Sequence, residues 1–308
     1  MHEPVNLASW AGRIDEADGK PGHRWHQIME AGVAADVSIL GLASDLGVAR
    51  NAGRPGAAEG PTALRAMLAN LPVHHDFRIA DQGNIVPMGG DLEFAQKEYA
   101  IAAGAHLSSE TLVLGLGGGH EIAWGSAQAM QSTFPEAKIG ILNIDAHFDL
   151  RDDSQATSGT SFLSALRASP ETTRYCVAGI SRSSNTMALY NRAQELGVKF
   201  YEDMAVYHDP DGVCEGITSW IETIDHLYLT VCLDVFSQAV APGVSAPASV
   251  GLSVPSVVTI VEAAASSHKL RLMDVAELNP SLDRDQQTAR LGARLIFAGV
   301  NAWLEQRA

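Results

Sequence analysis

The sequence contains few cysteines and no long apolar run, and both absences limit what it can encode. Its three cysteines lie far apart, at Cys176, Cys214 and Cys232, which is too few and too scattered for a disulfide framework or a thiolate zinc site. No stretch of about eighteen apolar residues is present to span a membrane, and the N-terminus lacks the basic and then apolar pattern of a secretory signal. We therefore expect reduced thiols, a cytoplasmic protein and no membrane partner.

Basic residues are also scarce. The chain has 21 Lys and Arg against 36 Asp and Glu, which gives a formal net charge of -15 at pH 7, and its basic residues form no clustered stripe. Such a protein repels a phosphate backbone at long range. We therefore expect no nucleic-acid partner.

Short apolar runs alternate with segments of helical period along most of the chain. The runs are almost continuously hydrophobic, as in parallel strands buried on both faces, and the segments between them are long enough for crossover helices. No internal repeat or charged linker divides the 308 residues, so we predict one α/β domain over 1–308, in which the less patterned residues 1–25 form a loose N-terminal arm. The predicted strands are 36–42, 111–116, 138–144, 174–180, 226–233 and 269–278, and the predicted helices are 60–70, 121–132, 186–196, 213–223, 254–267 and 284–298.

Three potential metal ligands end one predicted strand, at the edge where open parallel sheets bind ligands. The run NIDAHFDLR (143–151) spaces Asp145, His147 and Asp149 two residues apart, so an extended backbone directs their side chains to the same side. Carboxylates held this close repel each other unless a cation lies between them, and imidazole with carboxylate suits Mn, Zn or Fe. By itself the pattern fits a metal site and a polar cluster satisfied by backbone amides equally well.

Two further strand ends favour the metal site. GGGHE (117–121) places His120 at the start of a predicted helix, and its glycines lack the spacing of a P-loop. Cys232 and Asp234 alternate at the end of a later strand, and Glu277 ends the last predicted one. With the aspartates and histidine of the first motif, six side chains are too many for one tetrahedral ion. They suit two ions that share a bridging ligand and a water.

In this order and spacing, the motifs resemble the arginase, agmatinase and formimidoylglutamase family of ureohydrolases. The segments GGGHE, IDAHFD, LDVFSQAVAPGVSAP and DVAELNPSLDRDQQTARLGARLI carry the resemblance, which extends over residues 35–300. It implies a three-layer α/β fold with a central, largely parallel sheet flanked by helices, two Mn(II) ions, hydrolysis of a guanidinium or amidine carbon, and assembly into trimers or hexamers. It also implies that Asp145 bridges the ions and that Glu277 grips the cationic amidine. The metal ligands that it implies are His120, Asp145, His147, Asp149 and Asp234.

Cys232 departs from the family pattern, which usually has a bridging aspartate at this position. A thiolate is a softer ligand than a carboxylate and favours Zn or Fe(II) over Mn. We predict that Cys232 is the sixth ligand. The alternative is an inert buried thiol beside a weakened site, which would describe a metal-poor relative that binds an amidine or guanidine without hydrolysing it.

Several segments favour formimidoylglutamase within this family. Arginases and agmatinases usually carry a proton-shuttling histidine where TSGTSF (157–162) has Ser158. The segments 47–61, 179–186 and 241–248 also resemble formimidoylglutamases better. We therefore predict hydrolysis of N-formimidoyl-L-glutamate to L-glutamate and formamide, a step of histidine degradation. The alternative is a ureohydrolase that acts on agmatine or a guanidino acid and releases urea.

The predicted mechanism assigns roles to individual side chains. A hydroxide formed at the metals attacks the amidine carbon, Glu277 holds the amidine, and Asp149 carries a proton as the intermediate collapses. Because arginine forks match carboxylates, an arginine is expected to bind the glutamate end of the substrate. We predict Arg182, with Asn185 and Ser158, as the substrate-binding set. The arginines in the relevant loops are Arg50, Arg54, Arg151 and Arg182.

Overall fold

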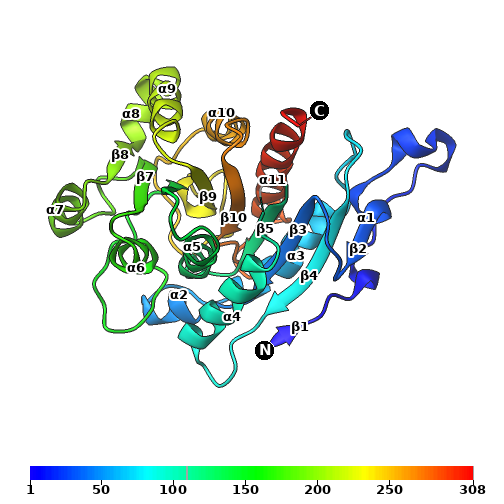
Figure 1. Cartoon of the computed structure of the whole chain (residues 1–308), viewed down its shortest axis with the longest axis horizontal. Helices are drawn as coiled ribbons and strands as arrows, with labels where there is room; N and C mark the ends of the chain where they lie inside the picture. The colour runs from blue at the N-terminus through cyan, green and yellow to red at the C-terminus, as the bar shows by residue number, and fades with distance from the viewer. Residues whose placement is uncertain (109, 308) are drawn as a thin grey trace.

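The computed structural model describes residues 1–108 and 110–307, and one ten-stranded sheet runs through them (Figure 1). Its strands are β1 (His2–Glu3), β2 (Met29–Ala31), β3 (Val37–Leu42), β4 (Ile79–Ile85), β5 (Leu112–Gly117), β6 (Ile139–Ile144), β7 (Thr173–Ile180), β8 (Lys199–Glu202), β9 (His226–Cys232) and β10 (Leu270–Ala276). The strand order is β1-β4-β3-β5-β10-β9-β6-β7-β8, with β2 also paired to β4. Among these strands only β1 pairs antiparallel. We propose that the chain is a single domain built on this sheet.

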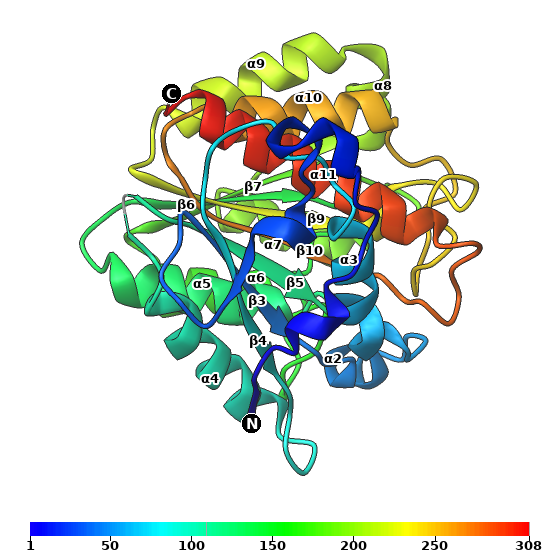
Figure 2. The ribbon, with the colours of Figure 1, turned by 90° about the vertical axis from the view of Figure 1, so that its right-hand side faces the viewer.

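Helices cover both faces of the sheet, as Figures 1 and 2 show. This arrangement confirms the predicted three-layer α/β fold with a largely parallel sheet. The first face packs against α3 (Gly60–Leu68), α8 (Asp203–His208), α9 (Pro210–Ile221), α10 (Val254–Ala265) and α11 (Gln287–Glu305). The second packs against α4 (Leu92–Gly104), α5 (Ile122–Thr133), α6 (Ser161–Ala168) and α7 (Met187–Glu195), and the short helices α1 (Trp25–Ile28) and α2 (Leu46–Arg50) lie in loops.

The central strands β5, β10, β9 and β6 are buried along almost their whole length. This burial on both faces explains why their sequences are apolar without alternation. Because the strands are parallel and in register, their carboxyl ends meet at one edge. Ala276 of β10 lies opposite Cys232 of β9, and Ile144 of β6 lies opposite Val231. The loops that follow these strands are therefore brought together.

All six predicted strands and all six predicted helices are present, but the sequence analysis missed the strands β1, β2, β4 and β8 and the helices α1, α2, α4, α6 and α8. The longest of the missed strands is β4. This strand contains the polar run DQGN (81–84), yet most of it is buried. Asp81 is tolerated there because Arg65 of α3 donates to both carboxylate oxygens, at 2.7 and 2.8 Å. A paired guanidinium thus satisfies a charge that would otherwise be costly to bury.

The predicted N-terminal arm, residues 1–25, is largely exposed, but several hydrogen bonds attach it to the rest of the chain, and two of its contacts involve β4. β1 pairs with the edge of β4. The Trp10 side chain is buried, and its indole N–H donates to Asp81 Oδ2 at 2.8 Å. The arm thereby extends the sheet at this edge. Among the described helices, none is both long and apolar enough to cross a membrane.

Replacing Trp10 with Phe tests the second attachment. The variant keeps an aromatic ring but loses a buried hydrogen bond to a charged group, so we expect the free energy of unfolding in urea to fall by about 1.5–3 kcal/mol. Leu7→Ala, at an exposed position of the same arm, should change it by less than about 0.5 kcal/mol. Equal stability of Trp10→Phe and wild type would contradict the attachment.

Candidate metal centre

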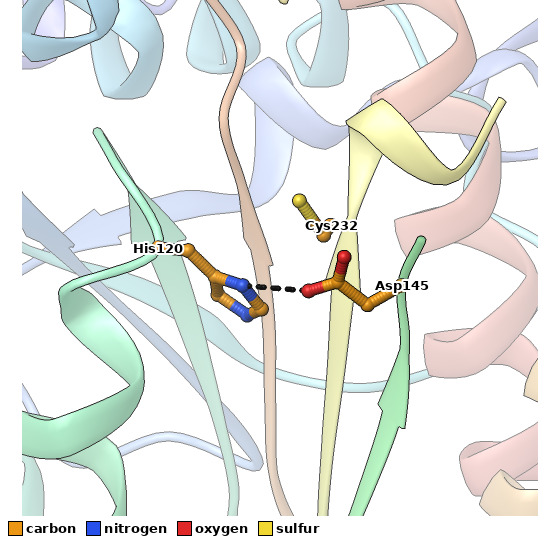
Figure 3. Close-up of side chains that lie close together, drawn as sticks. All are labelled: His120, Asp145 and Cys232. Carbon is orange, nitrogen blue, oxygen red and sulfur yellow. Dashed lines mark ion pairs between the residues drawn. The ribbon is translucent and has the colours of Figure 1, made fainter. Parts of the chain in front are cut away.

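Side chains from three strand ends converge at the carboxyl edge of the sheet. His120 follows β5, Asp145 follows β6 and Cys232 ends β9, and Figure 3 shows them reaching toward one another. One ligand atom from each lies within 4.8 Å of the others. Asp145 also belongs to a second group of this kind, with His147 and Asp234. It is therefore the carboxylate that the two groups share.

Two imidazoles alternate with three carboxylates in this cluster. His120 Nδ1 lies 3.0 Å from Asp145 Oδ2 and 3.0 Å from Asp149 Oδ2. His147 Nδ1 lies 3.4 Å from Asp145 Oδ1 and 3.3 Å from Asp234 Oδ2. The alternate residues of the D-x-H-x-D motif thus converge as the sequence predicts.

The clustered carboxylates favour binding of a cation. Burial and the Asp145 carboxylate raise the pKa values of Asp149 and Asp234. Burial disfavours the charged imidazoles, but the surrounding carboxylates outweigh it and raise the pKa values of His120 and His147 well above their usual range. Without metal, protons on the two histidines therefore hold the carboxylates together. A divalent cation would replace those protons.

Two buried atoms whose hydrogen-bonding capacity is unsatisfied also fit a bound metal. Within the described residues, His120 Nδ1 and Asp234 Oδ1 are buried and make no hydrogen bond of acceptable geometry. Burial raises the pKa of the Cys232 thiol well above its usual range, and Asp145 and Asp234 raise it further. The thiol is therefore neutral unless a cation stabilises the thiolate. Nitrogen, carboxylate oxygen and sulfur together form a donor set for a divalent transition metal.

The backbone is strained at two residues beside the cluster. Asp149 has φ 48° and Glu277 has φ 71°, a left-handed conformation that costs a residue with a side chain about 1–3 kcal/mol. The Glu277 N–H donates to Gly118 O at 2.8 Å, and Glu277 Oε1 accepts from the His120 N–H at 2.7 Å. Burial, with Asp234 and Glu121, raises the pKa of Glu277 to about 8.

A pocket of about 300 Å³ opens beside the cluster, and its lining combines carboxylates with arginines. The carboxylates are those of Asp149, Asp234 and Glu277. Among the other lining residues, Asn51 Nδ2 donates to Ser158 Oγ at 3.0 Å, and a Cβ at Gly159 would lie 3.2 Å from Arg151 Nε. Within the described residues the Arg151 guanidinium makes no hydrogen bond or ion pair, so it is available to an anion. The pocket is lined by Val48, Asn51, Ala52, Gly53, Arg54, His120, His147, Asp149, Arg151, Ser158, Ser184, Asn185, Leu189, Cys232, Asp234, Ser245, Ala246 and Glu277.

Comparison with known proteins assigns the chain to a family. Residues 35–300 match the Arginase family. The chain belongs to this family. A formimidoylglutamase of Ralstonia nicotianae is 43% identical over 326 residues, covering 100% of this chain and 99% of the relative. A formimidoylglutamase of Aromatoleum aromaticum is 45% identical over 309 residues, covering 94% of this chain and 90% of the relative.

Solved structures of arginase-family proteins share the fold. Formimidoylglutamase from Bacillus subtilis superposes with a TM-score of 0.79 at 21% identity, covering 89% of each chain. Trypanosoma cruzi formiminoglutamase, solved with Mn²⁺, superposes with a TM-score of 0.79 at 23% identity. That match covers 98% of this chain and 99% of the other.

The structure places the predicted substrate-binding residues of this arginase-family chain differently. Ser158 and Asn185 line the pocket, but Arg182 does not. The Arg182 side chain is 80% exposed, and its Nε donates to Glu202 Oε1 at 3.1 Å. The carboxylate on β8 therefore holds this guanidinium outside the pocket wall. The Arg54 guanidinium lines the pocket but donates to the carbonyls of residues 244 and 245.

The sequence analysis missed two polar residues around the centre, Asn51 and Glu121. Glu121 is fully buried, and its Oε1 accepts from Ser44 Oγ at 3.0 Å and from the Gly47 N–H at 2.9 Å. It thereby joins the start of α5 to the loop that carries α2. Its position next to His120 in the GGGHE motif was the available signal. Burial raises the pKa of Glu121 to about 7.

This raised pKa predicts a pH dependence of stability in the metal-free arginase-family protein. The folded chain holds a proton on Glu121 that the unfolded chain releases at lower pH, so stability should fall as pH rises from about 4.5 to 7. The Glu121→Gln variant lacks this loss, which is on the order of 3 kcal/mol. Urea unfolding at pH 5 and pH 8 after chelation measures it.

Glu195→Gln controls for the loss of one negative charge, because Glu195 is exposed on α7. Its stability should change with pH as that of wild type does. A Glu121→Gln variant with the wild-type pH dependence would contradict the prediction.

Proposed function

We propose that this arginase-family enzyme hydrolyses N-formimidoyl-L-glutamate to L-glutamate and formamide, a reaction of histidine degradation. Relatives more than 40% identical over nearly the full chain are formimidoylglutamases. The observation that carries the proposal is the mixed charge of the pocket lining, which combines carboxylates with Arg151, whose guanidinium makes no hydrogen bond or ion pair within the described residues. The substrate has complementary charges, since a cationic amidine is joined to two carboxylates.

We assign two Mn(II) ions to the cluster, in line with the Mn²⁺ in the T. cruzi formiminoglutamase. Zn or Fe(II) would also suit the sulfur ligand. The pair of ions would lower the pKa of a bound water toward about 7 and stabilise developing negative charge. One ion would be held by His120, Asp145, Asp149 and Cys232, and the other by Asp145, His147 and Asp234.

Two carboxylates act on the substrate in this proposal. Glu277 is held at the pocket wall by the His120 N–H, so its carboxylate is fixed for binding the planar amidine group. The amidinium supplies the charge that keeps Glu277 ionised despite its burial. Asp149 lines the same pocket. We assign to its carboxylate oxygen the transfer of a proton to the leaving amine as the tetrahedral intermediate collapses.

Arg151 replaces Arg182 as our candidate for the substrate carboxylates. Arg151 lines the pocket, and within the described residues its guanidinium has no protein partner, whereas the guanidinium of Arg182 bonds Glu202 in solvent. Ser158 and Asn51 add neutral polar groups to the pocket lining. Agmatine has no carboxylate for Arg151, which favours an amidino acid as the substrate.

Two alternatives from the sequence differ in product. A ureohydrolase acting on agmatine or a guanidino acid would use the same centre and release urea. A metal-poor relative would bind the amidine and release nothing. A cytoplasmic location and assembly into trimers or hexamers remain predictions, which fractionation and light scattering would test.

The decisive assay compares N-formimidoyl-L-glutamate, agmatine, arginine and guanidinobutyrate on Mn-reconstituted enzyme, with bound metal counted on the same sample. We expect formamide from the first substrate, no urea from the others, and two metal ions per chain. Urea from a guanidino substrate would establish the ureohydrolase instead. No product with one ion or none would favour the non-hydrolysing relative.

Arg151→Met tests the carboxylate subsite. Losing a charge-assisted hydrogen bond to the substrate should raise KM at least about tenfold. Arg182→Met is the matched control, because it removes an arginine that lies outside the pocket, and its KM should stay within about twofold of wild type. If Arg182→Met rather than Arg151→Met raises KM, the original sequence prediction is correct.

A further inference from the structure

Both N–H groups of the Asn185 side-chain amide donate to backbone carbonyls. Its Nδ2 donates to Ala146 O at 2.8 Å and to Ser181 O at 2.9 Å, and its Oδ1 accepts from the Phe148 N–H at 3.1 Å. Only 9% of the residue is exposed. The partners fix the amide orientation, because two carbonyls need the NH₂ group and one N–H needs the oxygen. No donor remains for a substrate.

The bonded backbone groups alternate with proposed metal ligands. Ala146 lies between Asp145 and His147, and Phe148 lies between His147 and Asp149. Asn185 bonds the carbonyl of Ala146 and the N–H of Phe148. Its side chain therefore spans the segment 145–149, which carries three proposed ligands. The Ser181 N–H adds a backbone bond to Ala146 O at 3.0 Å. The loop after β7 thus holds the loop after β6.

The strained backbone of Asp149 indicates what the hydrogen bonds of Asn185 do. A left-handed aspartate persists only where its surroundings fix the neighbouring peptides. The Phe148 N–H is held by Asn185, and the Phe148 carbonyl accepts from Tyr175 OH at 3.1 Å. Both polar groups of the residue before Asp149 are therefore fixed, and the turn directs Asp149 Oδ2 to 3.0 Å from His120 Nδ1.

We propose that Asn185 is a positioning residue for the metal centre, which holds the 145–149 segment in its ligating conformation, and that it does not bind substrate. The inference rests on the metal centre of the proposed function. It differs from the role that the sequence analysis gave to Asn185. Outer hydrogen bonds of this kind typically change metal affinity by about 10- to 100-fold.

The test compares Asn185→Ala and Asn185→Asp with wild type. The Asp variant keeps an acceptor for the Phe148 N–H but turns a carboxylate oxygen toward the Ala146 and Ser181 carbonyls, and it serves if the Ala variant does not fold. Ser183→Ala is the matched control, because among the described residues the hydrogen-bond partner of Ser183 Oγ is Ser181 Oγ in the same loop, at 3.0 Å. Three quantities are measured: Mn affinity by titration, amide hydrogen exchange over 145–149 in metal-free protein, and kcat and KM at saturating Mn.

We expect both Asn185 variants to bind Mn at least about tenfold more weakly, with faster exchange at the Phe148 amide and a KM within about twofold of wild type. Ser183→Ala should match wild type in all three. Unchanged Mn affinity with a raised KM would overturn the proposal and make Asn185 a substrate ligand. Wild-type protein that binds no Mn would overturn the metal centre itself, and the exchange measured on metal-free protein would still report whether Asn185 holds the segment.

Discussion

The fully buried carboxylate of Asp145 is the interaction on which the rest of the site depends. Its Oδ1 accepts the His147 N–H at 2.7 Å, and its Oδ2 accepts from Asn143 Nδ2 at 3.1 Å. Its own N–H donates to Ala178 O on the neighbouring strand. The carboxylate is thus fixed by β6 and β7 before any cation is present. Both groups of proposed ligands are arranged around it, so a shift of Asp145 would disturb both together.

The pocket reconciles a strongly acidic protein with an anionic substrate. A net charge of -15 is spread over the whole chain, but an interaction at contact distance depends on the nearest groups and on their dielectric surroundings. Two histidines lie among the carboxylates beside the pocket, and the proposed metals would neutralise these carboxylates further. Arg151 also lines the pocket, and within the described residues its guanidinium has no carboxylate partner. In the proposed complex, local charge rather than the overall balance would therefore orient the substrate.

The sequence predicted the central strands because burial on both faces leaves a continuous apolar run, and it predicted the ligand loops because alternate residues share a direction. It could not predict β4, since the polar Asp81 is stable there only through Arg65, sixteen residues earlier in the chain. Nor could the sequence identify which of the four loop arginines is available to bind the substrate carboxylates. The direction of Arg182 is set by Glu202, a partner on another strand, and Asn185 fills its hydrogen bonds with backbone that no local pattern identifies. Partners that no local sequence pattern identifies decided each of these cases.

The position of β10 has a consequence for synthesis of the protein. Among the described strands, β10 alone pairs with both β5 and β9, so it joins the half of the sheet built from β1 to β5 to the half built from β6 to β9. It is also the last of these strands in sequence, at residues 270–276. The continuous sheet can therefore form only after residues 270–276 have been synthesised. Until β10 pairs with them, β5 and β9 each present an unpaired apolar edge, and such edges favour association with other chains.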